Sequence, residues 1–170
     1  MLKEYLKKRK LKSSKEPSNN NERVKKGVEL IFVIQRHQAS HLHYDFRLEV
    51  DGVLKSWAIP KEPSMNPKVK RLAIRVEDHP LSYANFQGLI PEGNYGAGTV
   101  EIWDQGIYKP LFKVVENTTE ESLKMAIEKG HLDFVLKGKK MKGRFSLIKY
   151  KGKEENAWLL IKNSHDEEIP

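Results

Sequence analysis

A hairpin signal in the first half of the chain constrains the fold more than any other feature. Residues 42–50, "LHYDFRLEV", alternate strictly between apolar and polar side chains, as a half-buried strand does. The pair Asp51–Gly52 follows at once, and a second strand-like run, "VLKSWAIP", comes directly after it. Asp-Gly supplies the positive φ angles of a type I′ turn, so we predict two antiparallel strands joined by a tight hairpin.

Other strand-like segments surround this hairpin. "LIFVIQ" precedes it, and "RLAIRVE" follows it with Leu72, Ile74 and Val76 on one face. Three more candidates, "LDFVLKG", "KGRFSLIKY" and "NAWLLIKN", lie near the end of the chain. Short strands at hairpin spacing predict a mostly antiparallel barrel or sandwich.

One helix is predicted between the strands. Thr118 and Glu121 form a capping box, and Gly130 is a typical helix end. The apolar stripe of this helix is Leu123, Ala126 and Ile127.

The net charge of +8 is unevenly distributed. Residues 1–27 hold ten Lys and Arg against three Glu, whereas the remaining residues hold 21 basic and 20 acidic groups. A basic arm on a neutral body suits a polyanion partner such as nucleic acid, and the alternative is a solvated leader without function. We therefore divide the chain into a basic arm (1–27), one domain (28–164) and a C-terminal tail (165–170).

Several classes of protein are excluded by composition. The chain has no cysteine, which excludes disulfides and thiol nucleophiles and leaves only nitrogen and oxygen ligands for a metal. No apolar run approaches the roughly 18 to 20 residues of a membrane span. The N-terminus lacks the apolar core of a secretory signal, so we expect a cytoplasmic protein without a membrane partner.

The polar face of the first hairpin strand is the strongest candidate site. His43, Asp45 and Arg47 share the face opposite the apolar one. His37 lies six residues before His43, beyond a bend at "QAS", and can fold back beside the same site. Two imidazoles and a carboxylate are a common ligand set for Mn²⁺, Zn²⁺ or Fe²⁺. The alternative is an ordinary solvated strand face.

Arginine cannot lose its proton to bind a metal, but it suits a phosphate or a carboxylate. Arg47 therefore adds an anion clamp to the predicted cation, a pairing that fits phosphoryl chemistry. His79 is a second anchor, near a polar cluster formed by Arg71, Arg75, Asp78 and Tyr83. Its alternative is a simple turn residue before Pro80, and we interpret His41, His131 and His165 as structural or surface residues.

Three long segments carry a resemblance to a known family. They are "HQASHLHYDFRLEVDGVLKSWAIPKEPS", "KRLAIRVEDHPLSYANFQGLIPEGNYGAGTVEIWDQG" and "GHLDFVLKGKKMKGRFSLIKY…AWLLIK". Their combined pattern, HxxxxxHxDxR, then DHPxxY, then IPEGxYGxG, closely resembles the 3′-phosphoesterase domain of bacterial DNA ligase D. The likeness extends from about Leu2 to Asn163, and we expect a stand-alone archaeal or bacterial form of that domain.

The resemblance implies a fold, an activity and partners. The implied fold is mostly β: a compact antiparallel β-barrel with one or two short helices and a crescent groove for nucleic acid. The implied activity is metal-dependent 3′-end processing in DNA repair by non-homologous end joining. A phosphodiesterase step removes a terminal ribonucleoside, and a phosphomonoesterase step then leaves a 3′-OH. The implied cofactor is Mn²⁺, with Zn²⁺, Co²⁺ or another divalent metal as alternatives.

The implied substrate is a DNA primer-template, with or without a 3′-terminal ribonucleotide. The implied protein partners are a separate DNA ligase and a separate polymerase, and we expect the protein itself to be a monomer. The family's metal ligands correspond to His37, His43 and Asp45. Its other site residues correspond to Arg47 and His79 near the scissile phosphate, with Tyr83, Arg71 and Arg9. His79 would protonate the leaving oxygen or contact the phosphate. Where the family often has an acid after Arg9, this chain has Lys10, so we expect weaker removal of the 3′-phosphate.

Two other functions fit parts of the pattern. His43 and Asp45 with a distant His79 also match the two-His, one-carboxylate triad of an iron oxygenase. A barrel that binds nucleic acid without catalysis is the second alternative. Oxygen consumption would favour the first, and binding without end processing would favour the second.

Overall fold

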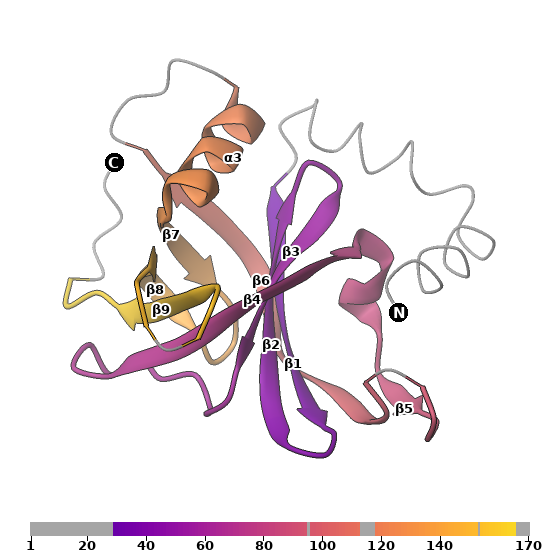
Figure 1. Cartoon of the computed structure of the whole chain (residues 1–170). Helices are drawn as coiled ribbons and strands as arrows, with labels where there is room; N and C mark the ends of the chain where they lie inside the picture. The colour runs from indigo at the N-terminus through magenta and orange to yellow at the C-terminus, as the bar shows by residue number, and fades with distance from the viewer. Residues whose placement is uncertain (1–28, 95, 113–117, 153, 166–170) are drawn as a thin grey trace.

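Nine antiparallel strands form one sheet in the computed structural model, which describes residues 29–94, 96–112, 118–152 and 154–165. A pairing between β1 and β6 closes eight of the strands into a barrel (Figure 1). In spatial order these are β1 (Leu30–Gln38), β2 (Leu42–Val50), β3 (Val53–Ile59), β4 (Lys70–Pro80), β9 (Ala157–Lys162), β8 (Lys142–Lys149), β7 (His131–Lys137) and β6 (Gly98–Leu111). The predicted fold class is confirmed.

The predicted hairpin and helix are both present. Asp51 and Gly52 adopt φ angles of 52° and 78°, and Val50 pairs with Val53 across the turn. The helix α3 (Thr119–Lys129) begins after Thr118, whose hydroxyl accepts a hydrogen bond from the Glu121 N–H. It ends at Gly130, which has a left-handed φ of 87° that suits glycine.

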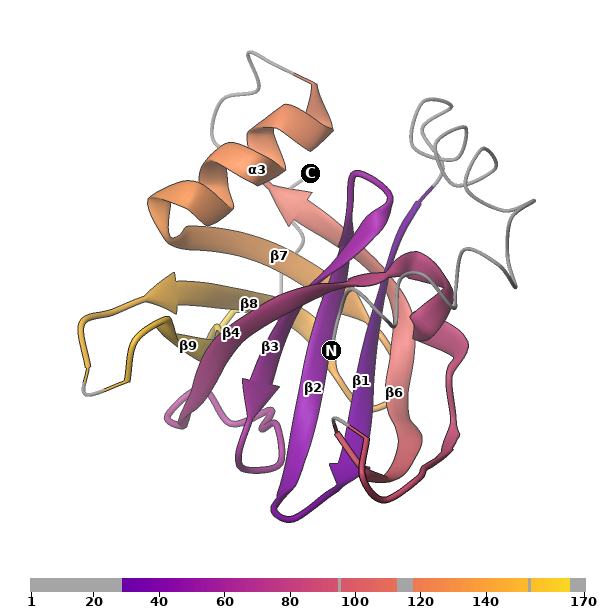
Figure 2. The same cartoon turned by 45° about the vertical axis from the view of Figure 1, so that its right-hand side comes forward.

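Two short elements lie outside the closed barrel. A 3₁₀ turn, η1 (Leu81–Asn85), follows β4, and β5 (Gly88–Ile90) pairs with the first residues of β6. Figure 2 shows the turn between β1 and β2 at one end of the barrel and α3 at the other. Within the described ranges, no helix has the length and apolarity needed to cross a bilayer.

The apolar face of β2 fills the barrel. Phe46 and Leu48 are fully buried there, together with Trp57 and Phe134. The outer face of β1–β3 is covered as well, because η1 contributes Leu81, Tyr83 and Ala84 to a second apolar cluster with Val33 and Leu54. The polar side chains of β2 therefore lie between the barrel wall and a second layer, rather than on an open strand face.

Candidate metal centre

Three side chains predicted as metal ligands converge on the outer face of β1 and β2. The β1–β2 register places His37 directly opposite His43, and Asp45 lies two residues further along β2. The Asp45 Oδ2 atom is 3.5 Å from His37 Nδ1 and 3.3 Å from His43 Nε2. One ligand atom from each of the three residues lies within 4.8 Å of the others. The fold-back of His37 expected from the "QAS" bend is thus produced by the turn at residues 39–41.

The outer nitrogen of each imidazole faces a backbone carbonyl. His37 Nε2 lies 2.7 Å from Gly96 O, and His43 Nδ1 lies 3.1 Å from His41 O. A carbonyl only accepts hydrogen bonds, so both of these nitrogens must donate. In the neutral rings, His37 Nδ1 and His43 Nε2 then carry lone pairs that point toward the Asp45 carboxylate. The two imidazole nitrogens and the Asp45 carboxylate thus form three converging electron-pair donors, and backbone carbonyls fix the orientation of both rings. A divalent cation stabilises this arrangement, so the three residues fit a metal.

Asp45 is held as an anion by its neighbours. Burial alone raises the pKa of Asp45, but the adjacent His37 and His43 imidazoles, which can donate to the carboxylate when they are protonated, and the charge of Arg47 outweigh burial and leave that pKa far below its usual value. The hydrogen bond to Asp45 in turn raises the pKa of His43. The carboxylate is therefore ionised at neutral pH, as a metal ligand must be.

Arg47 lies beneath the cluster and is almost fully buried, with 3% of its surface exposed. Its Nε donates to Gln35 Oε1 at 2.7 Å, and its Nη1 donates to Ser56 Oγ at 2.8 Å. Its Nη2 is 3.5 Å from Asp45 Oδ2. A buried guanidinium needs hydrogen-bond partners of this kind, and one edge of the Arg47 guanidinium faces the proposed metal ligand Asp45. The structure brings Arg47 to the cluster, while its contact with a phosphate stays a prediction.

Gln35 connects Arg47 to the second layer. It is fully buried, and its Nε2 donates to Tyr83 O at 2.9 Å and to Phe86 O at 3.2 Å. The same amide accepts from Arg47, so it fixes the position of the guanidinium relative to η1. Sequence reasoning missed Gln35 and Ser56. The only signal was one polar residue at the end of the apolar run "LIFVIQ".

His79 and Tyr83 lie beside Arg47. Their ring centroids are 5.1 Å apart, and Arg47 Cζ lies 5.0 Å from the Tyr83 ring centroid. His79 Nδ1 donates to Glu77 O at 3.1 Å. Burial and then the charge of Arg47 lower the pKa of His79 to about 4, so its ring is neutral at pH 7. The predicted grouping of His79 and Tyr83 with Arg47 is therefore present in the structure.

Arg71 is placed elsewhere. It pairs with Leu160 of β9 near the start of β4, and its Nε donates to Glu62 O at 2.7 Å. Strand alternation puts Arg71 on the same face as Ala73, which belongs to the barrel core. The structure does not bring Arg71 to the outer face that carries the metal cluster, and its contact with substrate stays a prediction. Arg9 and Lys10, with the rest of the predicted arm, lie outside the described residues.

The Gly-rich segment "GNYGAG" also has a function that sequence reasoning did not assign. Gly93 and Gly96 lie between β5 and β6, Gly98 begins β6, and the Gly96 carbonyl orients His37. Gly96 has a φ of 75°, and a Cβ added there would lie 3.4 Å from His37 Cε1. Gly98 is tighter still, since a Cβ would lie 2.1 Å from Gln38 O. The glycines therefore let this loop approach the end of β1 closely.

We expect Gly96→Ala to weaken Mn²⁺ binding by roughly tenfold or more, because loss of a group that orients a metal ligand has effects of this size. The added methyl would lie in van der Waals contact with the His37 ring, and the strain of a side chain at this positive φ would shift the carbonyl that orients His37. Titration calorimetry with Mn²⁺ measures the change directly. Gly93→Ala is the matched control, because Gly93 has a similar φ of 88° but a Cβ added there would have nothing within 4 Å. Equal weakening in both variants would contradict a role for Gly96 in orienting His37.

Comparisons with known proteins show the family of this chain. Residues 35–149 match the family described as the DNA ligase D 3′-phosphoesterase domain. The chain is 48% identical over 163 residues to the multifunctional non-homologous end joining protein LigD of Pseudomonas aeruginosa, covering 95% of this chain and 18% of that protein. It is 45% identical over 140 residues to the corresponding DNA repair protein of Mycobacterium tuberculosis, covering 81% of this chain and 17% of that protein. The chain thus spans less than a fifth of the length of these relatives.

Proposed function

The chain belongs to the family of the DNA ligase D 3′-phosphoesterase domain, and from this membership and the site geometry we propose a metal-dependent enzyme that processes DNA 3′ ends in non-homologous end joining. A phosphodiesterase step would remove a terminal ribonucleoside, and a phosphomonoesterase step would leave a 3′-OH. The observation that carries the proposal is the convergence of two oriented imidazoles and an ionised carboxylate beside a buried arginine.

His37, His43 and Asp45 would hold the metal, which we propose to be Mn²⁺. A bound divalent cation supplies Lewis-acid stabilisation of the charge that develops on a phosphoryl group. Arg47 would help to hold the ligand Asp45 in place, because its Nη2 edge faces that carboxylate. Gln35 and Ser56 accept hydrogen bonds from its other donors and fix its position. The same edge is the part of Arg47 that would face a phosphate oxygen.

His79 and Tyr83 would flank the phosphate from the η1 side. Tyr83 is stacked on Phe86 with ring centroids 5.0 Å apart, and its backbone carbonyl accepts from Gln35. The His79 and Tyr83 rings are therefore fixed relative to Arg47 before substrate binds. Such fixed groups suit a site that acts by positioning and electrostatics. We keep Arg9 as a proposed phosphate contact and Lys10 as a reason for weak phosphomonoesterase activity.

Water is the proposed nucleophile. Ser56 is the hydroxyl beside Arg47, but it is fully buried, it accepts from Arg47, and it donates to Leu54 O. A serine held in this way cannot approach a phosphorus atom. A covalent enzyme intermediate on Ser56 is therefore disfavoured, and hydrolysis in a single displacement at each step is the simpler course.

A labelled primer-template tests the proposal. One strand ends in a single ribonucleotide or in a 3′-phosphate, and it is incubated with the protein and either Mn²⁺ or EDTA. We expect trimming to a 3′-OH with Mn²⁺ and none with EDTA, as resolved on a denaturing gel. Trimming that survives exhaustive chelation would contradict the metal-dependent proposal.

The same assay separates the alternatives. The oxygenase hypothesis used His79 as the third ligand, whereas the converging group contains His37 instead. Iron-dependent oxygen consumption without end trimming would favour that class. Binding of the primer-template with no trimming in any divalent metal would favour a non-catalytic barrel.

A further inference from the structure

A second group of positive charges lies at the turn between β7 and β8. Residues 137–144, "KGKKMKGR", hold five basic residues and no acidic one. Lys139 and Lys140 at the tip are exposed, and the described residues place no carboxylate within ion-pair distance of either ammonium group. We propose that these two lysines bind the phosphate backbone of the nucleic acid whose 3′ end lies at the metal centre. This inference rests on the proposed function.

The turn is held in one conformation by a buried carboxylate. Asp104 of β6 is 4% exposed and accepts from three consecutive backbone N–H groups, those of Lys139 at 2.8 Å, Lys140 at 3.2 Å and Met141 at 2.8 Å. The Gly138 N–H also donates to Met141 O at 3.0 Å. The lysine backbones are therefore placed before any ligand binds, so binding requires little ordering of the turn.

The barrel core anchors the same turn. Met141 is fully buried in the core cluster between the exposed Lys140 and Lys142. Gly138 leaves no room for a side chain, because a Cβ there would lie 2.4 Å from Asp104 Oδ2 and 2.7 Å from Phe32 Cζ. A turn that only has to be solvated does not need a buried side chain and close packing of this kind. The arrangement presents the lysine tip rigidly.

The tip lies in the part of the barrel that faces the β1–β2 end. Lys124 of α3 pairs with Asp51 in the β2–β3 turn, which places α3 at the end opposite the β1–β2 turn (Figure 2). Strand β7 begins directly after α3 and runs toward the β1–β2 end, and the lysine turn that follows it is held by Asp104 of β6. Asp104 pairs with Ile34, three residues before His37 in β1.

Ring contacts connect the tip to β2. The Lys140 ammonium group lies 4.5 Å from the Trp103 ring centroid, and Trp103 packs edge-on against Tyr44 at 5.7 Å. Tyr44 lies between His43 and Asp45 in β2, and its side chain points to the core face of the strand, opposite the face that carries the metal cluster. A nucleic acid strand bound at the metal centre would therefore have to cross the rim of the barrel to place its phosphates at the lysine tip.

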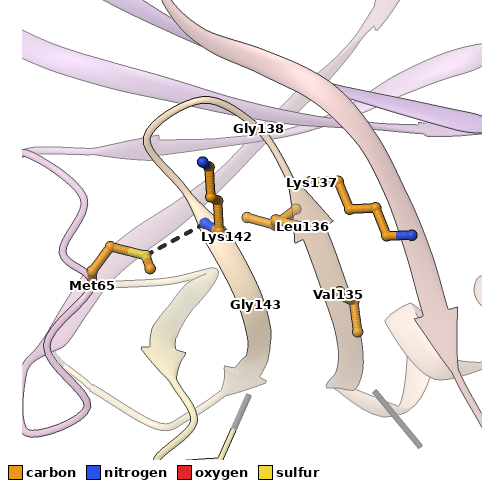
Figure 3. Close-up of a pocket in the computed structure, with 7 residues that line it drawn as sticks. All are labelled: Met65, Val135, Leu136, Lys137, Gly138, Lys142 and Gly143. Carbon is orange, nitrogen blue, oxygen red and sulfur yellow. Dashed lines mark hydrogen bonds between the residues drawn. The ribbon is translucent and has the colours of Figure 1, made fainter. Parts of the chain in front are cut away.

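The other lysines of the hairpin have different surroundings. Lys137 and Lys142 line a cavity of about 420 Å³ beside Met65, and in Figure 3 their side chains leave the two strands in different directions. The Lys142 backbone N–H faces Met65 Sδ at 3.5 Å. This cavity shares no residue with the metal centre. We therefore assign the nucleic-acid contact to Lys139 and Lys140 alone.

Nucleic acid fits this surface better than a protein partner does. Stable protein interfaces use aromatic or apolar anchors and are depleted of lysine. At the tip, Met141 is buried and Lys140 lies over the Trp103 ring, so neither offers such an anchor. What remains is a pair of ammonium groups on a rigid turn, and paired cations suit successive phosphates.

The test is the salt dependence of binding to a fluorescein-labelled DNA primer-template, measured by anisotropy. The variant is Lys139→Gln with Lys140→Gln. Its matched control is Lys129→Gln with Lys151→Gln, which removes the same charge from exposed positions at the α3 end of the barrel. Each lost phosphate contact lowers the slope of log K against log salt by about 0.7 to 0.9, so we expect a decrease of about 1.4 to 1.8 for the tip variant and little change for the control.

The tip variant should also require several times more primer-template to reach half-maximal trimming, while Mn²⁺ binding by calorimetry stays at the wild-type value. Equal slopes for the tip variant and the control would overturn the inference even if the wild-type protein trims 3′ ends. A competition experiment tests the assignment to nucleic acid, with unlabelled DNA or polyglutamate added to displace the labelled DNA. If polyglutamate displaces it at the same concentration of negative charges as unlabelled DNA does, the assignment to nucleic acid is overturned. Absence of trimming by the wild-type protein in Mn²⁺ would instead refute the proposed function, and the binding slopes would then be judged separately.

Discussion

Asp45→Asn is expected to lower the turnover of both phosphoesterase steps by a factor of about 10³ or more. An amide keeps the size of the carboxylate but removes the negative charge that faces His37, His43 and Arg47. A metal ion contributes several kcal/mol to phosphoryl chemistry, and about 1.4 kcal/mol corresponds to tenfold in rate, so loss of the site accounts for a factor of this size.

The control for this prediction is Asp133→Asn. Asp133 also lies beside a histidine, with His131 Nε2 at 3.1 Å from its Oδ1, but it belongs to β7 and is outside the converging ligand group. Rates of each step on diester and monoester primer-templates, with Mn²⁺ binding by calorimetry, are the measurements. Circular dichroism checks that both variants are folded. Near-normal turnover of folded Asp45→Asn would show that the ligand assignment is wrong.

Much of the site was predictable from the alternation of one strand. "LHYDFRLEV" predicted that His43, Asp45 and Arg47 share a face, and the β2 register confirms it. The position of His37 followed from a short bend, because a hairpin returns the chain on itself within a few residues. Local pattern and short-range turn geometry therefore accounted for the proposed ligand set.

The partners of Arg47 could not be predicted in this way. Gln35 and Ser56 meet Arg47 from β1 and β3, and both contacts depend on registers between strands. Alternation also shows only that residues share a face. It does not show that η1 covers that face, which is why a polar strand surface proved to be buried.

The effect of Gly96 was hidden for a similar reason. A Gly-rich loop indicates positive φ angles and close approach, but not which group is approached. The contact with His37 joins residues 59 positions apart. It depends on the pairing of β1 with β6, which no local pattern specifies.

His79→Ala is expected to slow both phosphoesterase steps by about 10² to 10⁴, the range typical of a positioned proton-transfer or phosphate-contacting group. His79→Gln should recover part of this loss. In the free protein Nδ1–H donates to Glu77 O, so Nε2 of the neutral ring carries a lone pair. Contact with a phosphate oxygen through Nε2 then requires proton uptake, which the bound phosphate charge favours, whereas a glutamine amide donates without titrating.

The pH dependence follows from the lowered pKa. Burial and Arg47 hold the pKa of His79 at about 4 in the folded protein, below the ordinary value of about 6.5. Between these values the unfolded chain binds more protons at this residue than the folded protein does. Stability should therefore fall as the pH falls from about 6.5 to 4, and it should fall less steeply in His79→Gln. Chemical denaturation at several pH values measures this difference.

Low pH lowers the stability contributed by His79, but we expect it to favour the contribution of His79 to kcat/KM. If substrate binding requires a protonated His79, the ratio of wild-type to His79→Gln kcat/KM should decrease as the pH rises from 5.5 to 8.5, because the free protein holds that proton ever more rarely. The decrease should be the same for the diester and the monoester, because kcat/KM reports the pKa of His79 in the free protein. His131→Ala, at an exposed histidine outside the site, should keep wild-type rates at every pH. A ratio that is independent of pH, with equal rates for the Ala and Gln variants, would show that His79 accepts a proton instead of donating a hydrogen bond to the phosphate.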